Sequence, residues 1–542
     1  MRKYFQQLLS YKYTLFIVIL LAGVFFARLH FITANPLAMD EPFSVFHAQM
    51  NISDIVSELK NGNNPPLYEI ILHFWISVFG TSELSVRLPS LIFSILTILF
   101  TYSLARKFLN NRIAVLSALL MSLSATHIMF SHEARAYPLL MMLTTISFMI
   151  YLTLVNNQYK RKHLILLVFV YALMAYTHYM AFVVIALQSA VLLCFIRSKK
   201  ELVYKFLLVL LGFAVLYIPN IVILFNRFTD TVALGTWIKP VEDMGIFFDM
   251  MRLFTNNNKY AFILISALFL GAAGVAIYLH QLNKWIKRIM LFIIIPGYFL
   301  ICYSVYFNIP FLWHLTSSPA IIKCFVLSLP LFAVTAIFMK YTKITGGIII
   351  VWFIIPLSIF FLLSYLIPLF IDRYLSFTLP AFYLTIAIAA DTLFRKNKTF
   401  AIAALIILLP FGLTYQPFVS NNRYIDKMIS DVNMVQSQDT KIVLTPFFYN
   451  TTFAYHKCPE CFAGFNSINN CLAENNIRLV DDSVYMAPYF NDFSNIVLVD
   501  AYSAPNSPAK ALYEWLNHRL IIQKTFSYPD SSHVYYFSGR IE

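Results

Sequence analysis

Long apolar segments alternate with short charged connections along the chain as far as about residue 420. The segments are about 18 to 25 residues long, the length that an α-helix needs to cross the hydrocarbon core of a bilayer. This pattern predicts a polytopic α-helical membrane protein with about 13 transmembrane helices. The predicted spans are residues 13–32, 84–105, 112–131, 138–156, 163–178, 180–196, 203–222, 260–280, 289–308, 321–339, 345–366, 376–394 and 399–416.

The composition agrees with this prediction. Hydrophobic residues make up 59% of the 542 positions, charged residues only 12%, and the mean hydropathy is +0.70. A soluble chain of this length needs far more polar surface to cover itself. The first apolar segment is too long for the core of a secretory signal and lacks a small-residue cleavage site, so we expect it to be retained as a helix.

The charges indicate which ends of the spans face the cytoplasm. Of the 31 Lys and Arg residues before residue 420, 21 lie in connections on the same side as the N-terminus. Of the 14 acidic residues in that region, only Glu201 and Asp391 share this side. The positive-inside rule therefore predicts a cytoplasmic N-terminus, in the cell membrane, with the last 120 or so residues outside. The net charge of +14 then reflects anchors at anionic lipid and gives no sign of nucleic-acid binding.

Two extracytoplasmic segments are long enough to have structure of their own. The first outer loop, 33–83, carries apolar residues at helical spacing in 52–59 and restarts after Pro65-Pro66, which predicts two interfacial helices. After residue 420 the composition becomes that of a soluble α/β domain. We therefore divide the chain into a transmembrane catalytic domain, 1–419, and an extracytoplasmic domain, 420–542.

Within the C-terminal part, short apolar runs predict buried strands at 441–446 and 496–499. A helix is expected over 507–520, because Ser507 and Pro508 suit its N-cap and first position. A closing hairpin is expected over 521–528 and 533–538.

The six cysteines fall into two groups of three. Cys194, Cys302 and Cys324 lie in or near spans and are expected to be inert core residues. The outer group is Cys458, Cys461 and Cys471, which could supply zinc ligands, a redox pair or a structural disulfide that leaves one cysteine unpaired. The disulfide is the interpretation that we favour.

The candidate chemistry begins with Asp40 and Glu41, which follow the first span directly. Ionisable groups at a membrane are costly and are functional candidates by default. One interpretation is a salt bridge with Arg87 or Arg135. The other is a general base, since a partly shielded carboxylate can take a proton from an acceptor hydroxyl. Adjacent residues cannot both point at one atom, so one would act and the other would organise.

Further polar residues lie at the same predicted face. Glu133, Arg135 and Tyr137 come where the third span ends, either as a polar cap or as part of a site. Arg373 and Tyr374 lie at the corresponding end between two later spans. Arginine suits a phosphate, because its planar fork donates two hydrogen bonds and stays charged. His178, also at the outer end of a span, is typical of an interfacial residue.

Several short motifs resemble a known family. They are Asp40-Glu41, Asn64-Pro65-Pro66-Leu67-Tyr68, Phe79-Gly80 with Ser82-Glu83 and Arg87-Leu88-Pro89-Ser90, Glu133-Ala134-Arg135-Ala136-Tyr137, and Arg373-Tyr374. The chain resembles the dolichyl-phosphate-mannose–protein mannosyltransferase-like family, which includes the lipid A aminoarabinose transferases and belongs to the C-type (GT-C) glycosyltransferase superfamily. The aminoarabinose branch has an arginine shortly after its acidic pair, whereas Pro42-Phe43-Ser44 follows here.

The resemblance implies an enzyme that transfers a sugar from a polyprenyl-phosphate donor to a lipid, glycan or protein acceptor at the outer face, with inversion by single displacement. It implies that Asp40 is the base, that Glu41 assists in the pocket, and that Arg135 and Arg373 hold the phosphate. No cofactor is certain, and a divalent metal ion is left open. The catalytic candidates are Asp40, Glu41 and Glu133; the substrate-binding candidates are Arg135, Tyr137, Arg373, Tyr374, Tyr68 and Arg87.

The competing hypothesis is a transporter or flippase for a lipid-linked substrate. Such a protein is expected to carry polar residues near the bilayer midplane and related halves with interrupted helices. The charged residues of this chain gather at the span ends, and no internal repeat is evident. We therefore favour the glycosyltransferase.

Overall fold

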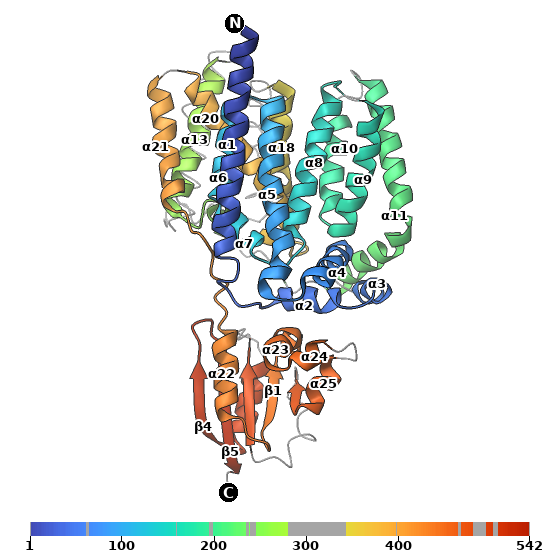
Figure 1. Cartoon of the computed structure of the whole chain (residues 1–542), viewed down its shortest axis with the longest axis vertical. Coiled ribbons are helices and arrows are strands. Elements are labelled where there is room, and N and C mark those ends of the chain that lie inside the picture. The colour runs from blue at the N-terminus through green and yellow to red at the C-terminus, as the bar shows by residue number, and fades with distance from the viewer. Residues whose placement is uncertain are drawn as a thin grey trace.

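The computed structural model describes residues 2–60, 64–158, 160–193, 199–234, 238, 245–279, 343–396, 398–463, 468–480, 495–501 and 508–540. A bundle of long helices forms one part of the molecule and a mixed sheet with short helices forms the other (Figure 1). The chain begins at the end of the bundle that is distant from the sheet and ends at the far end of the sheet (Figure 1). The predicted spans 289–308 and 321–339 lie outside the described residues.

The other predicted spans coincide with helices. Predicted span 112–131 is a pair of helices that meet at a bend of 63°. The bundle helices are α1 (Arg2–His30), α5 (Glu83–Phe108), α6 (Asn111–Ser122), α7 (Ala125–Ser131), α8 (Tyr137–Val155), α9 (Arg161–Thr177), α10 (Ala181–Leu193), α11 (Lys200–Leu234), α13 (Lys259–Leu279), α18 (Lys343–Leu363), α20 (Leu379–Phe394) and α21 (Lys398–Leu413), with the shorter α12 (Gly245–Phe254) and α19 (Asp372–Leu375).

Not all of these helices are long enough to cross a bilayer alone. By length and composition, six helices in the described part of the chain can span a membrane, or seven if α6 and α7 form one bent span. The helix α10 has 13 residues, which at a rise of 1.5 Å per residue is about 20 Å, short of a hydrocarbon core of about 30 Å. The protein is an integral membrane protein, and the count of 13 crossings stays a prediction.

The break between α6 and α7 is closed by polar side chains. Ser124 caps α7 by accepting a hydrogen bond from the His127 backbone N–H at 3.1 Å. The Tyr383 hydroxyl, from α20, donates to the Ser124 hydroxyl at 2.6 Å. Asn256 accepts from the Ala125 N–H at 2.8 Å and donates to the Leu123 carbonyl at 3.1 Å. These partners satisfy backbone groups that a bent helix leaves open.

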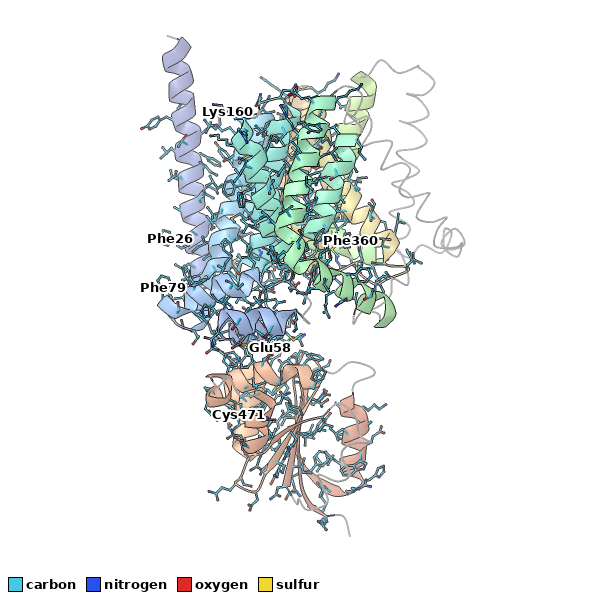
Figure 2. The ribbon with its side chains drawn as sticks, turned by 90° about the vertical axis from the view of Figure 1, so that its right-hand side faces the viewer. Phe26, Glu58, Phe79, Lys160, Phe360 and Cys471 are labelled. Atoms are coloured by element: carbon cyan, nitrogen blue, oxygen red, sulfur yellow. A yellow bond between two sulfur atoms is a disulfide. The ribbon has the colours of Figure 1, made fainter. Side chains whose placement is uncertain are left out.

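The first long loop contains three helices, α2 (Asp40–Ala48), α3 (Ile52–Leu59) and α4 (Leu67–Phe79). The helices α3 and α4 occupy the two segments of this loop that were predicted to be helical. Ile55 and Leu59 of α3 are buried, whereas Ile52 and Val56 are exposed. Glu58 of α3 lies at the end of the bundle that faces the sheet, and Lys160 lies at the opposite end (Figure 2).

The helix α2 was not predicted, and it begins at the acidic pair. Asp40 and Glu41 occupy its first turn, where negative charge is favoured by the helix dipole. Pro42 also falls in the first turn, where its missing N–H breaks no hydrogen bond of the helix. The preceding Met39 has a φ of 59°, so the chain turns sharply into the helix.

The sheet has five strands in the order β2-β1-β3-β5-β4. β1 (Lys441–Thr445) pairs in parallel with β2 (Ile477–Leu479) and β3 (Asn495–Asp500). β5 (His533–Arg540) pairs antiparallel with β3 and with β4 (Leu520–Ser527). The short helices of this part are α22 (Ile425–Val435), α23 (Asn450–Lys457), α24 (Pro459–Ala463), α25 (Ile468–Glu474) and α27 (Pro508–Asn517).

Most of the sheet agrees with the strands and hairpin expected from the sequence. One boundary is different: α27 ends at Asn517, and Leu520 begins β4 opposite Arg540. The Arg519 N–H bonds back to the Leu516 carbonyl at 2.9 Å, which closes the last helical turn. Leu520 is then buried in the core of the sheet, which an extension of the helix would not allow.

The sheet part contacts the segment that leads into α2. His456 of α23 donates from Nε2 to the Leu37 carbonyl at 2.7 Å, and the Thr452 hydroxyl donates to the Met39 carbonyl at 3.3 Å. The rings of Phe462 and Phe46 lie 5.7 Å apart between centroids. The start of α2 is therefore held between the bundle and the sheet part.

Candidate active site

Asp40, the first residue of α2, lies between two arginines from distant parts of the chain. Its Oδ2 accepts a hydrogen bond from the Arg373 guanidinium at 2.6 Å and lies 3.9 Å from that of Arg135. The Asp40 side chain is 46% exposed, so it can be reached by a ligand. Partial burial raises the pKa of this carboxyl, but the positive charges of Arg135 and Arg373 outweigh that effect and hold the pKa below its ordinary value.

Glu41 points the other way and forms a buried pair with Arg87 of α5. The Arg87 Nε donates to Oε1 at 2.8 Å, and a second guanidinium nitrogen donates to Oε2 at 2.7 Å. The Ala134 N–H also donates to Oε1, at 2.9 Å. The rest of the Arg87 guanidinium donates to three carbonyls of the loop before α2, those of Ile32, Asn35 and Pro36. This pair fastens the loop to the bundle.

Arg135 is nearly buried and is held by α2. One guanidinium nitrogen donates to the Asp40 carbonyl oxygen at 3.1 Å and to the Ser44 hydroxyl at 2.8 Å. The Ser44 hydroxyl in turn donates to Oε1 of Glu69 at 2.9 Å. The guanidinium carbon lies 5.9 Å from the centre of the Tyr137 ring, within the range of a cation–π contact.

Glu133 lies in the turn between α7 and α8 and is partly buried. Among the described residues, the neighbours of its carboxyl act on it through charge, and none forms a hydrogen bond with it. Burial and the negative charge of Glu41 raise the pKa of Glu133 to about 8, with Asp372 and Asp40 adding to the effect and Arg373 opposing it. This carboxyl is therefore largely protonated at neutral pH.

Two of the predicted substrate-binding tyrosines flank a histidine beside the arginines. The His178 ring lies 5.9 Å from the Tyr137 ring and 5.7 Å from the Tyr374 ring, between centroids. The Met180 N–H donates to Nδ1 of His178 at 3.1 Å, which orients the imidazole. Tyr374 follows Arg373 in the short helix α19, so the aromatic group and the cation come from one turn.

The remaining predicted residue, Tyr68, lies in the interior. Its side chain is fully buried, and its hydroxyl lies 3.0 Å from that of Ser90, which donates to the Arg135 carbonyl at 3.2 Å. Tyr68 and Arg87, both predicted to bind substrate, therefore lie behind the exposed group and support it. The structure brings together Asp40, Arg135 and Arg373, with Glu133, Tyr137 and Tyr374 around them.

The sequence analysis missed the second layer behind this group. Ser44 and Ser90 were quoted only within longer motifs and Glu69 was not named, although each bonds to Arg135 directly or through one intermediate. The available signal was Glu69, an acidic residue directly after Pro65-Pro66-Leu67-Tyr68 in an otherwise apolar helix.

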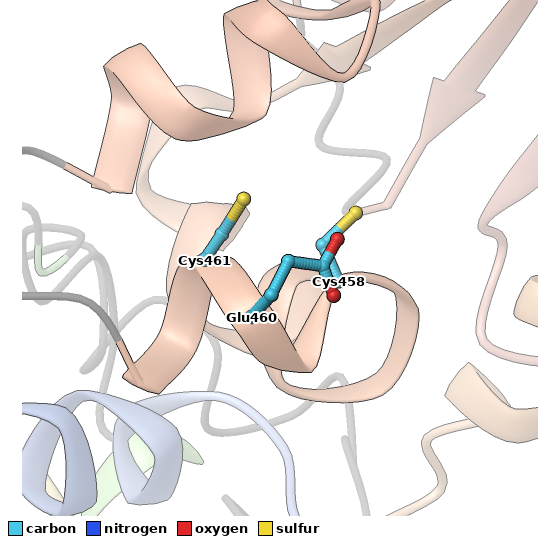
Figure 3. Close-up of side chains that lie close together, drawn as sticks. All are labelled: Cys458, Glu460 and Cys461. Atoms are coloured by element: carbon cyan, nitrogen blue, oxygen red, sulfur yellow. The ribbon is translucent and has the colours of Figure 1, made fainter.

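A metal site was one of the alternatives for the outer cysteines. In the part of the chain that the structure describes, Cys458, Glu460 and Cys461 bring their ligand atoms within 4.8 Å of one another (Figure 3). Cys461, however, forms a disulfide with Cys471, so it offers no thiolate. Cys458 is a buried free thiol whose pKa burial raises to about 11. This group does not fit zinc, and the structure has the disulfide with one unpaired cysteine.

The fold is similar to that of a solved membrane-protein structure, ArnT from Cupriavidus metallidurans. ArnT from Cupriavidus metallidurans bound to undecaprenyl phosphate superimposes with a TM-score of 0.51 at 12% identity, covering 96% of this chain and 98% of that chain. The apo state of ArnT and the archaeal oligosaccharyltransferase AglB from Archaeoglobus fulgidus also match, at TM-scores of 0.46 and 0.47. AglB is 12% identical, with 96% of this chain and 74% of that chain covered.

The sequence match is to the mannosyltransferases that the motifs indicated. Residues 63–223 match the model of the dolichyl-phosphate-mannose-protein mannosyltransferase family. The match includes Tyr68, Arg87, Glu133 and Arg135 of the group described above. The predicted resemblance is thus confirmed. A comparison with curated proteins finds no match.

Proposed function

We propose that this protein is a membrane glycosyltransferase that moves a sugar from a polyprenyl-phosphate donor to an acceptor at the outer face of the membrane. The observation that carries the proposal is the ion cluster of Asp40 with Arg373 and Arg135 at the end of the bundle. This cluster places a carboxylate that can act as a base, Asp40, beside two arginines that can bind a phosphate, Arg135 and Arg373. The match to the mannosyltransferase family and the fold shared with ArnT support the proposal.

Arg135 and Arg373 bind the donor phosphate. Without donor, the carboxylate of Asp40 is the anion that these two guanidinium groups share. A phosphate competes for the same donors, because it accepts the bidentate hydrogen bonds that arginine supplies. Tyr374, which is partly buried, presents aromatic surface beside the phosphate, and the buried Tyr137 packs against Arg135. Glu133 offers a protonated carboxyl to the sugar or the acceptor.

Asp40 then acts as the general base. While it is paired with Arg373 its pKa is low, which makes it a weak base. When the phosphate draws the arginines away, the carboxylate loses those charges and its proton affinity rises. Asp40 removes the proton from the acceptor hydroxyl as that oxygen bonds to the anomeric carbon.

The leaving group departs in the same step. The bond from the anomeric carbon to the phosphate oxygen breaks on the opposite face, which inverts the configuration and releases polyprenyl phosphate. Arg135 and Arg373 stabilise the negative charge that develops on the phosphate, and fixed donors of this kind supply much of the rate in such reactions. Glu41 is held in its pair with Arg87 and organises the loop while Asp40 acts.

The proposal includes the topology. The N-terminus is cytoplasmic, and the sheet part, as a separate domain after residue 419, lies outside the cell membrane above the site. Basic residues gather at the predicted inner ends of the helices, as the positive-inside rule requires.

The test is a transfer assay with purified protein, radiolabelled polyprenyl-phosphate sugars and extracted lipids, glycans and proteins. Release of polyprenyl phosphate is expected from the natural chain and is expected to fall by a factor of at least about 100 in Asp40→Asn. Asp54→Asn, an exposed aspartate of α3, is the matched control and keeps full activity. Full turnover by Asp40→Asn would refute the assignment. Movement of the lipid across the membrane without release of polyprenyl phosphate would indicate a carrier.

A further inference from the structure

The buried carboxylate of Glu69 is not used in the mechanism above. It is the third residue of α4, after the N-cap Pro66, and is 3% exposed. Its Oε1 accepts one hydrogen bond, from Ser44, and its Oε2 has no hydrogen-bond partner among the described residues. Burial raises the pKa of Glu69, against the opposing effects of the Arg135 charge, the Ser44 hydrogen bond and, more weakly, the backbone N–H of Glu69 itself.

Such a group is expensive to bury. An acid that leaves water and finds a single partner loses more solvation than one hydrogen bond returns. The core of α4 around it is apolar, with Leu72 and Ile76 also buried on the helix. A leucine at this position would fill the same space without that cost, so packing alone gives no reason for an acid here.

The partner of Glu69 connects it to the site. Ser44 lies one turn after Asp40 on α2, and its side chain is fully buried. A hydroxyl has one hydrogen and two lone pairs. Because Ser44 donates that hydrogen to Glu69, its lone pairs are available to Arg135, which donates to the oxygen at 2.8 Å. Because Ser44 donates to Glu69, it accepts the hydrogen bond from Arg135.

We propose that Glu69, acting through Ser44, is a positioning residue that holds the Arg135 guanidinium in place for the phosphate of the donor. This inference rests on the proposed function. On one side the Arg135 guanidinium faces the Asp40 carboxylate, 3.9 Å away. On the other, one of its nitrogens is held by the Asp40 carbonyl oxygen and by the Ser44 hydroxyl, which is itself bonded to Glu69. When a phosphate replaces the Asp40 carboxylate, Ser44 and Glu69 keep the Arg135 guanidinium in the same position. Binding of the phosphate then costs less conformational entropy, because the side chain is already ordered.

The test is a double-mutant cycle on binding of undecaprenyl phosphate. Glu69→Ala and Ser44→Ala are each expected to weaken binding about tenfold, which is about 1.4 kcal/mol. The double variant is expected to bind as each single variant does, because both changes break the same chain of contacts. Glu69→Gln keeps an oxygen that accepts from Ser44 and is expected to bind within about twofold of the natural chain.

The controls separate positioning from folding. Glu58→Ala changes an exposed acid of α3 and leaves binding unchanged. Ser44→Ala removes one oxygen, so it tests the proposal even where Glu69→Ala does not fold. A merely structural role would lower the thermal midpoint and affect the KM of donor and acceptor alike, whereas a positioning role changes the donor alone.

The outcomes distinguish the two proposals. If the natural chain binds undecaprenyl phosphate and Ser44→Ala binds it equally well, the positioning role is wrong and the proposed function stands. Additive losses, about 100-fold in the double variant, would also overturn the role. If the natural chain does not bind undecaprenyl phosphate, the proposed function itself fails.

Discussion

Two adjacent acids, Asp40 and Glu41, have different environments because they begin a helix. Successive residues of an α-helix are about 100° apart around its axis, which follows from 3.6 residues per turn. Glu41 therefore points into the bundle towards Arg87 of α5, while Asp40 points out towards Arg373. One acid is committed to structure, and the other remains accessible to a ligand.

The Glu41–Arg87 pair is expected to stabilise the fold. Glu41→Gln leaves the buried guanidinium without its counter-charge, and we expect a loss of about 3–5 kcal/mol in the free energy of unfolding. The double variant Glu41→Gln with Arg87→Met is expected to be destabilised by less than the sum of the two single variants, since both changes break the same pair. Thermal unfolding of the purified variants in one detergent measures both. Equal stability of Glu41→Gln and the natural chain would contradict this role.

The raised pKa of Glu133 predicts how binding of the donor phosphate depends on pH. Because the pKa of Glu133 is raised to about 8, its carboxyl ionises as the pH passes that value and adds a negative charge beside the donor phosphate. Binding of undecaprenyl phosphate is therefore expected to weaken above pH 8 in the natural chain and to stay level in Glu133→Gln, whose amide cannot ionise. The same shift lowers the stability of the folded state as the pH rises from 4.5 to about 8, since the folded protein binds the proton more tightly.

That prediction has a direct check. Binding is measured from pH 6 to 9.5 for the natural chain, Glu133→Gln and the control Glu58→Gln. The same alkaline decrease in Glu133→Gln would show that another group is responsible.

At the scale of elements, the hydropathy pattern found the long helices and missed the short helix α2. The predicted spans appear as α1, α5, α8 and α11, because twenty apolar residues in a row have few alternatives. The helix α2 was missed, since nine residues with a proline in the first turn give no clear period. The bend between α6 and α7 was missed as well, because Ser124 and Tyr383, which close it, are far apart in the sequence.

The bend gives a prediction at this scale. Ser124→Ala removes the N-cap of α7 and the acceptor of the Tyr383 hydroxyl, and it is expected to cost about 1 kcal/mol of stability. Ser117→Ala is the control and is expected to change stability little, because in the described part of the chain its hydroxyl bonds only to the Ala114 carbonyl of the same helix, α6. Thermal unfolding compares the two. Equal midpoints would show that the bend does not depend on this cap.

At the scale of the whole molecule, the sheet part lies at the end of the bundle that the charge pattern predicts to face outward. Lys160 and Glu58 lie at opposite ends of the bundle, and the sheet part lies at the end that carries Glu58 and the Asp40 group (Figures 1 and 2). The contacts of His456 and Thr452 with the segment before α2 make the sheet part a neighbour of the site.

The positions of Glu58 and Lys160 at opposite ends of the bundle predict which of them a reagent outside the cell can reach. A membrane-impermeant thiol reagent is expected to label Glu58→Cys in intact cells and Lys160→Cys only after the cells are permeabilised. The natural chain, with its own cysteines, gives the background. Labelling of Lys160→Cys from outside would reverse the proposed orientation.

The sequence by itself determined the class of the protein, its long helices, the asymmetry of charge between the two ends of its helices and the residue types of the proposed phosphate site. Hydropathy, charge and short motifs belong to local segments and need no partner to be recognised. Only the tertiary structure decided which acid pairs with which arginine. Glu41 meets Arg87 across 46 positions of the chain, and Asp40 meets Arg373 across 333. The support behind Arg135, through Ser44 and Glu69, joins three separate segments, and contacts of this kind arise only when the helices pack.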